Sequence, residues 1–327
     1  DNDKDKTLSA MLRMAVIAQT QERYEKAPVE TDEQRAEKAA LEGLVKQLFV
    51  ELKRDFKPSD LPPYTLVKLG MHLAGTSQPE ESIAYFDEIL DPSEPDPVRK
   101  KARINGMSKY RKNAVFGKAV ALGRSKDNAK VDTAIKMMRD ELSKEESSSN
   151  PDRKAMEDAQ YNLVKFTSAR QDWPAVIAAA DKYRENKTYK KNLPEVLYLQ
   201  GEAYLKQNEL DKALINFMNI TGTYKGLVKW SAPAVLAQMD TLWKRNTMSQ
   251  GAGKQPSDRY VAWKAGSQYV QLLDTPANRK KMTAEDSALV NEVKDKTAKF
   301  GSDPAVSQER ADIAAYEAAV RAAKGQK

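Results

Sequence analysis

Apolar residues recur at three- and four-residue intervals along most of the chain, which is the periodicity of amphipathic α-helices. The clearest stretch runs from Pro194 to Phe217 and reads PEVLYLQGEAYLKQNELDKALINF. In this stretch one apolar stripe ends, a short polar turn follows, and a second stripe begins. The pattern predicts two helices that pack against each other across the turn.

Similar stripes predict helices along the rest of the chain, with prolines, glycines and capping residues at their ends. The predicted ranges are 7–26, 31–56, a pair within 64–89, 96–124, 128–142, 152–169, 173–184, 229–245, 260–273, 282–300 and 304–324. Two tetrads, Thr31–Gln34 and Ser77–Glu80, have the form of a capping box, which satisfies backbone donors of the first helical turn. The polar segment 145–150 is predicted to be a linker, with Asn150 as the cap of the next helix.

A fixed spacing of small and large residues recurs in three of the predicted helix pairs. In the best copy, Ala213 and Phe217 follow Gly201 by twelve and sixteen residues, and Tyr204 lies one turn after Gly201. The same spacing occurs at Gly70, Ser82 and Phe86, and again at Val164, Val176 and Ala180. These residues are expected to pack the helices of each pair together, and they report architecture rather than ligand binding.

This spacing resembles the signature of the tetratricopeptide repeat, best at residues 194–227, then at 64–97 and 157–190. Separations of 34 to 37 residues are typical of helical-hairpin arrays. The resemblance implies an all-α fold of antiparallel helix-hairpin repeats stacked into a right-handed superhelical solenoid. The expected organisation is an N-terminal helical pair at 1–60, degenerate repeat-like helices at 61–146, repeats at 151–248, and C-terminal helices at 257–327 that cap the array.

The resemblance also implies a concave groove that binds a peptide or protein segment. Polar side chains on the first helix of each pair line the groove in this family. The corresponding positions here are Tyr198, Glu202, Lys206, Tyr161, Lys165, Val67 and Met71. The alternative is that these side chains are ordinary solvated surface.

The charge balance leaves a second function open. The 327 residues include 54 Lys and Arg against 47 Asp and Glu, a net charge of +7, which favours acidic partners or anionic surfaces. Nucleic-acid or anionic-polymer binding through basic helix faces is therefore the alternative function, although no nucleic-acid motif accompanies the charge. The basic clusters lie at residues 99–103, 109–112, 182–191 and 279–281, with Tyr110, Tyr183 and Tyr189 nearby.

Candidate chemistry is sparse in this sequence. There is no cysteine, which excludes a thiolate site. His72 is the only histidine, so a multi-histidine metal site cannot form and a Ser-His-Asp triad would have to use this one residue. Gly251–Lys254 resembles part of a phosphate-binding loop, but Gln255 stands where that motif has Ser or Thr. We expect no catalysis, metal or cofactor. The four tryptophans are expected to pack in the core, with Trp230 a candidate for an exposed aromatic anchor.

The expected compartment follows from weaker signals. No apolar run is long enough to span a bilayer. The polar start DNDKDKTLSA suits an exported protein, periplasmic or associated with a bacterial cell envelope, with the cytoplasm as the alternative. Exported members of the family often act as envelope scaffolds or assembly factors, so the expected function is a non-catalytic scaffold in cell-envelope assembly.

Overall fold

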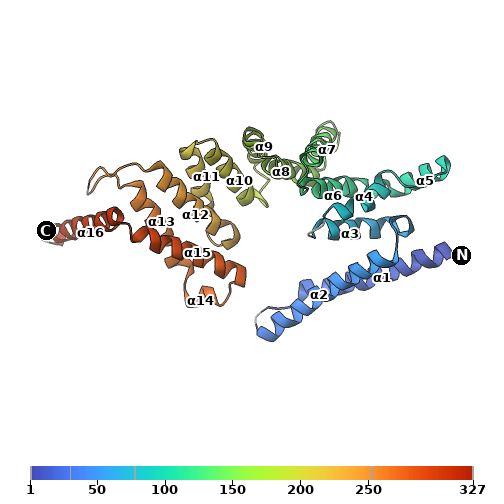
Figure 1. The fold of residues 1–327 in the computed structure, drawn as a ribbon, viewed down its shortest axis with the longest axis horizontal. Helices are drawn as coiled ribbons and strands as arrows, with labels where there is room; N and C mark the ends of the chain where they lie inside the picture. The colour runs from blue at the N-terminus through green and yellow to red at the C-terminus, as the bar shows by residue number, and fades with distance from the viewer. Residues whose placement is uncertain (1, 30, 77–78, 252, 326–327) are drawn as a thin grey trace. The chain divides into compact units, whose positions relative to one another are not determined.

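The computed structural model describes residues 2–29, 31–76, 79–251 and 253–325. These residues form α-helices, short 3-10 helices and loops, with no strand among them, as the helical periodicity predicts (Figure 1). The chain divides into two compact units, Asp1–Arg170 (unit 1) and Gln171–Lys327 (unit 2). The division falls inside the segment 151–248 expected to be one part, and not at the polar linker 145–150.

Unit 1 is built from successive helices that pack on their neighbours in the chain. α1 packs on α2, α3 on α4, α4 on α6, α6 on α7, and α7 on α8. The elements are α1 (Asn2–Lys26), α2 (Asp32–Asp55), η1 (Pro58–Asp60), α3 (Pro63–Ala74), η2 (Pro79–Ser82), α4 (Ile83–Leu90), α5 (Pro97–Met107), η3 (Ser108–Tyr110), α6 (Arg111–Gly123), α7 (Asn128–Glu146) and α8 (Arg153–Ala169).

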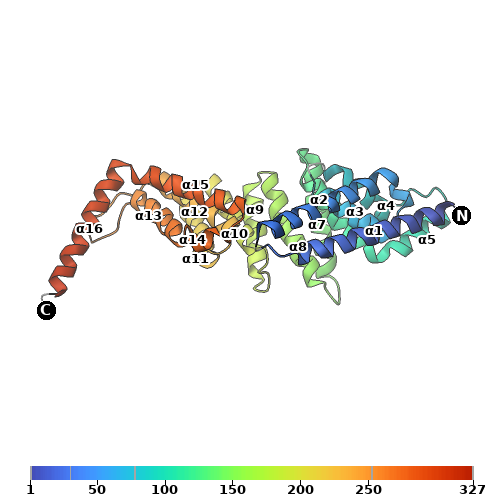
Figure 2. The same cartoon turned by 90° about the horizontal axis from the view of Figure 1, so that it is seen from below.

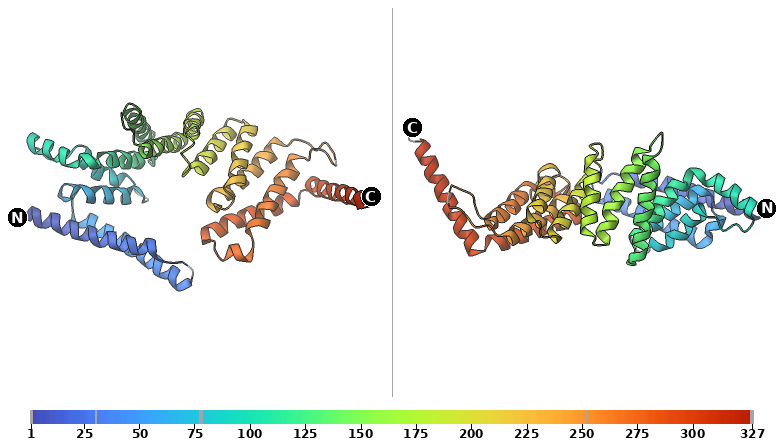
Figure 3. Two further views of the ribbon diagram at one scale, coloured as in Figure 1. Left: turned by 180° about the vertical axis from the view of Figure 1, so that it is seen from behind. Right: turned by 90° about the horizontal axis from the view of Figure 1, so that it is seen from above.

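Unit 2 continues the same sequential packing. α9 packs on α10, α10 on α11, α11 on α12, and α12 on both α13 and α15, which the views from two further sides show (Figure 2 and Figure 3). The elements are α9 (Trp173–Glu185), α10 (Leu193–Lys206), α11 (Leu210–Thr223), α12 (Val228–Arg245), α13 (Asp258–Leu273), α14 (Pro276–Arg279), α15 (Ala284–Gly301) and α16 (Pro304–Gly325).

Glycines at the predicted packing positions lie directly against phenylalanine rings. A Cβ added at Gly201 would come within 2.6 Å of the Phe217 ring, and one at Gly70 within 2.8 Å of the Phe86 ring. Gly117 of α6 faces the same Phe86 ring, so this ring lies between two glycine-lined helices. The other residues with the predicted spacing, Ser82, Val164, Val176, Ala180 and Ala213, are fully buried, and Tyr204 is half-buried.

The structure corrects several predicted boundaries. The single helix expected at 96–124 is broken into α5, η3 and α6. Gly106 and Ser108 are weak helix formers, and the break lets α6 pack against α3 and α4. Asp152, not Asn150, caps α8 by accepting a hydrogen bond from the backbone of Ala155. The short helix α14 was not predicted.

The capping predictions have different outcomes. Thr31 and Gln34 form the predicted capping box at the start of α2, with both reciprocal hydrogen bonds present. The second predicted box includes Ser77 and Gln78, which lie outside the described residues. In the part of the chain that the structure describes, no helix is long and apolar enough to cross a membrane.

The last helix is anchored mainly through its first turns, and farther along it the Tyr316 ring lies against Gly253. Val306 is fully buried, Glu309 accepts a hydrogen bond from the backbone N–H of Ser257 at 2.8 Å, and the Arg310 guanidinium lies 4.1 Å from the Trp263 ring centroid. From residue 311 onward the helix is mostly exposed. α16 therefore covers only a small part of α13 and α15.

Candidate functional site

One face of α10 carries three of the predicted groove residues. Tyr198, Glu202 and Lys206 follow one another at four-residue intervals, so they form a single stripe on the helix. Tyr198 and Glu202 are half-buried and Lys206 is exposed. α10 packs against α9, α11 and α12, and the part of this stripe that stays accessible is the open face of the helix.

Tyr198 belongs to an aromatic cluster made by three helices. Its ring centroid lies 5.9 Å from that of Phe217 on α11 and 6.4 Å from that of Trp230 on α12, with tilted ring planes. Tilted pairs at such distances are favourable beyond the apolar area they bury. Phe217 is fully buried, whereas Tyr198 and Trp230 are half-buried. The cluster thus fixes two aromatic side chains at the surface.

Glu202 is a carboxylate held partly out of water. Burial raises its pKa above the usual value, and the hydrogen bond with Tyr198 and the charge of Lys206 only partly oppose this effect. Burial also raises the pKa of Tyr198, with further contributions from the negative charges of Glu202 and Glu292. Among the described residues Glu202 forms no salt bridge. Its carboxylate therefore keeps acceptor capacity for a group outside the chain.

The remaining predicted groove residues belong to unit 1. Val67 is only 6% exposed and packs in the core, so it is corrected from a groove residue to a core residue. The open stripe of α3 is Tyr64, Lys68 and Met71, one residue out of phase with Val67, because α1, α2, α4 and α6 all contact α3. Met71 is 45% exposed.

The two residues predicted on α8 interact with each other. The Lys165 ammonium lies 5.3 Å from the centroid of the half-buried Tyr161 ring, a cation–π contact within one helix. These residues, like Val67 and Met71, lie in unit 1, whereas the stripe on α10 lies in unit 2. The candidate site is therefore built from unit 2 alone.

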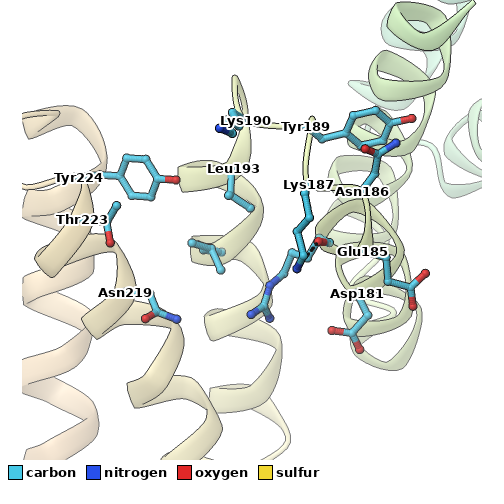
Figure 4. A pocket seen from close by; sticks show the side chains of 12 residues that line it. Asp181, Glu185, Asn186, Lys187, Tyr189, Lys190, Leu193, Asn219, Thr223 and Tyr224 are labelled. Carbon is cyan, nitrogen blue, oxygen red and sulfur yellow. Dashed lines mark hydrogen bonds between the residues drawn. The ribbon is translucent and has the colours of Figure 1, made fainter.

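A cavity that the sequence did not predict lies on unit 2. Its volume is about 970 Å³, and Figure 4 shows the residues that line it. The end of α9, the loop 186–192, the first turns of α10 and the end of α11 form its walls. The lining residues are Asp181, Arg184, Glu185, Asn186, Lys187, Tyr189, Lys190, Leu193, Leu197, Asn219, Thr223 and Tyr224.

A buried amide fixes one wall of this cavity. Gln200 is fully buried, donates to the Asp181 carboxylate at 2.7 Å, and accepts from the Arg184 guanidinium at 2.6 Å. The amide nitrogen and the amide oxygen of Gln200 each have a hydrogen-bond partner, as a buried polar side chain requires. Arg184 and Asp181 are held at the wall by a neutral group and do not pair with each other.

The loop between α9 and α10 is held by its own contacts. Tyr183 and Tyr189 are buried, and their ring centroids lie 5.2 Å apart. Asn186 accepts hydrogen bonds from the backbone N–H of Thr188 at 3.1 Å and from its hydroxyl at 2.7 Å. The loop therefore presents Lys187 and Lys190 from a fixed turn.

These contacts change the interpretation of the basic clusters. Tyr183 and Tyr189 were candidates for stacking on bases, but Tyr183 is fully buried and Tyr189 is only 7% exposed. Two arginines in or beside other clusters are engaged within the chain. Arg103 pairs with Glu88 at 3.0 Å, and Arg279 donates to Asp274 and Asn291.

The ring of the lone histidine packs against an aromatic side chain. The His72 ring stacks on Phe49 with centroids 4.0 Å apart, and burial, with a smaller contribution from Lys46, lowers its pKa. No cluster of metal-ligating side chains occurs within the described ranges. The tryptophans are half-buried, and Trp243 stacks on Phe300 at 3.9 Å between centroids.

No protein-family model, curated protein or solved structure matched this chain. The geometry of unit 2 therefore has to carry the functional argument. It offers two features, the α10 stripe with its aromatic cluster and the cavity beside the 186–192 loop. The basic residues of 182–191 gave a signal for the cavity, but its apolar wall comes from separate segments and could not be found from spacing.

Proposed function

We propose that this chain is a non-catalytic helical scaffold, and that unit 2 binds a segment of another protein along the open face of α10. The tetratricopeptide-like spacing and the Gly201–Phe217 contact support a rigid hairpin as the platform. Rigid helical elements hold contact residues more precisely than loops do.

The observation that carries the proposal is the half-buried Glu202 beside two half-exposed aromatic rings. Keeping a carboxylate partly desolvated without a salt bridge costs stability, and such groups concentrate at functional sites. An arriving backbone N–H or cationic side chain would supply Glu202 with a further donor beside Tyr198. Tyr198 and Trp230 provide the large, rigid surfaces that dominate binding energy in protein interfaces.

Cross-linking followed by affinity capture tests the proposal. The wild-type protein is compared with Tyr198→Ala, Glu202→Gln and a control, Lys299→Ala, an exposed residue on α15. We expect both α10 variants to lose at least tenfold in recovery of the partner, and the control to match wild type. Circular dichroism confirms that each variant is folded. Unchanged recovery with the two α10 variants would refute the placement of the site.

Nucleic-acid binding remains the second candidate because of the net charge of +7. The affinity for a labelled oligonucleotide would then fall steeply between 50 and 200 mM salt, with a slope set by the phosphates contacted. A weak and salt-insensitive interaction would eliminate this candidate.

A further inference from the structure

The cavity beside the 186–192 loop combines an apolar side with a cationic rim. Leu193 and Leu197 of α10 and the ring of Tyr224 supply the apolar side. In Figure 4 Tyr224 points across the opening toward Leu193, and Asn219 points into the same space. Arg184 at the end of α9 and Lys187 and Lys190 of the 186–192 loop supply the cations, and in Figure 4 Lys190 lies next to Leu193. The cavity volume of about 970 Å³ is at the upper end of the range for ligand pockets.

We propose that this cavity binds an acidic peptide segment, with one carboxylate among Arg184, Lys187 and Lys190 and an apolar or aromatic side chain against Leu193, Leu197 and Tyr224. The site goes beyond the function proposed above, because it does not use the Tyr198–Glu202 face of α10.

The three cations of the cavity are held by neutral groups of the chain or by none. Arg184 is bonded to the neutral amide of Gln200, and Lys187 donates to the backbone oxygen of Arg184 at 3.5 Å. Neither they nor Lys190 has a salt bridge to a carboxylate among the described residues. Elsewhere in unit 2, Arg245, Arg259, Arg279 and Lys294 all pair with aspartates. Three cations and two carboxylates, Asp181 and Glu185, line the cavity, and the cations form no ion pair with either carboxylate.

The same wall favours a peptide over a nucleic acid. Asp181 lies on it, and a chain of phosphates would have to pass this carboxylate. In Figure 4 the Glu185 carboxylate points away from the opening, which leaves room for one or two anionic groups on the lysine side. Base stacking needs open aromatic faces, and since Tyr183 and Tyr189 are buried, only the ring of Tyr224 among the lining residues is left for it. Asn219, Thr223 and Asn186 offer the amide and hydroxyl groups that a peptide backbone can bond.

A unique thiol can report the electrostatics of the cavity, since the chain has no cysteine. Asn219→Cys places a thiol in the cavity, and Met218→Cys, at a neighbouring position that is 54% exposed and does not line the cavity, is the control. Each is modified with an anionic and a cationic methanethiosulfonate. We expect the anionic-to-cationic rate ratio to be about three- to tenfold higher for Asn219→Cys, because cations line the same cavity and salt screens charges only beyond a Debye length of about 10 Å.

Removing the rim charges should abolish that difference. Adding Lys187→Gln and Lys190→Gln should bring the ratio for Asn219→Cys close to that of the control. A charge-matched pair, Lys182→Gln and Lys191→Gln, removes two exposed lysines that do not line the cavity and should leave most of the difference in place. Equal loss with both pairs, or no initial difference, would overturn the proposed cationic site.

Direct binding decides the ligand class. Fluorescence anisotropy is measured with a labelled hexapeptide pool of Leu, Tyr and Glu, the same pool with Gln in place of Glu, and labelled hexathymidylate. The Glu pool should bind at least tenfold tighter than the Gln pool. Lys187→Gln with Lys190→Gln should remove that preference, whereas Tyr198→Ala should not. Tighter binding of hexathymidylate, equal binding of both pools, or no binding of the Glu pool would each refute the acidic-peptide site.

Discussion

The contact between Gly201 and Phe217 gives the sharpest test of how the helices of unit 2 pack. Replacing Gly201 by Ala adds one methyl group that would come 2.6 Å from a ring carbon of Phe217. Ordinary carbon–carbon contacts are about 3.5 to 4.0 Å, so the ring or the helix has to move by about 1 Å. Phe217 is fully buried and α11 packs against both α10 and α12, which leaves little room for that movement.

Two opposing effects set how much Gly201→Ala changes the free energy of unfolding. Overfilling a packed interior costs about 1 to 3 kcal/mol. Ala also stabilises a helix interior relative to Gly by about 1 kcal/mol. Gly222→Ala, in the last turn of α11, is a control without overfilling, because nothing lies within 4 Å of its added Cβ. Gly201→Ala should be less stable than Gly222→Ala by about 1 to 3 kcal/mol, which is mainly the overfilling cost.

Urea unfolding followed by tryptophan fluorescence is the assay. All four tryptophans lie after residue 170, so the signal comes from unit 2. With a slope of about 2 kcal/mol per molar urea, a 2 kcal/mol difference separates the midpoints by about 1 M. Phe217→Leu in the Gly201→Ala background should recover part of the loss, because the smaller side chain relieves the contact.

Coincident midpoints for Gly201→Ala and Gly222→Ala would refute this reasoning. They would mean that the ring moves aside at negligible cost, and that the glycine is not required for close helix approach. If Phe217→Leu does not restore any of the stability lost in Gly201→Ala, the strain lies elsewhere on α10.

Three further predictions concern other contacts. Asp258 is 3% exposed and accepts hydrogen bonds from Arg245 at 2.6 and 2.8 Å, so Asp258→Ala should lower the free energy of unfolding by about 3 kcal/mol in urea titrations. An effect below 1 kcal/mol would count against a strong pair. Burial raises the pKa of Glu202 in the folded state above its value in the unfolded chain. Ionised Glu202 therefore destabilises the fold, and this penalty develops as pH rises from the unfolded-state pKa through the folded-state pKa. Glu202→Gln should raise Tm at pH 7.5 and not at pH 4. A variant that is less stable at pH 7.5 would contradict this sign. Phe86→Ala should cost about 3 to 5 kcal/mol by circular dichroism, whereas the exposed Met71→Ala should cost less than about 0.5 kcal/mol. Similar losses for the two would contradict the packing.

Periodicity was sufficient to predict most helices, because their stripes record which side faces the core. The break between α5 and α6 was missed because the apolar pattern continues through Met107, while the weak helix formers around it end α5. Spacing also predicted the glycine–phenylalanine contacts of both well-matched pairs. It did not reveal that Phe86 also meets Gly117, because that contact joins one helix pair to the next helix.

The sites were harder to predict than the fold. Val67 was misplaced because a one-residue change of phase turns a surface position into a core position, and only the helices around α3 decide the phase. The cavity depends on Arg184, Leu197 and Tyr224, which belong to three separate elements. The exposed or buried state of Tyr183 and Tyr189 likewise depends on how the 186–192 loop folds back.

The Phe86 ring, which occupies the space between Gly70 and Gly117, has an evolutionary consequence. Three helices, α3, α4 and α6, share this one side chain, so the three positions are not free to change one at a time. A related sequence with a smaller residue at position 86 should carry a larger one at position 70 or 117. Correlated substitutions at these three positions would identify related proteins that keep this packing even where their overall sequence similarity is low.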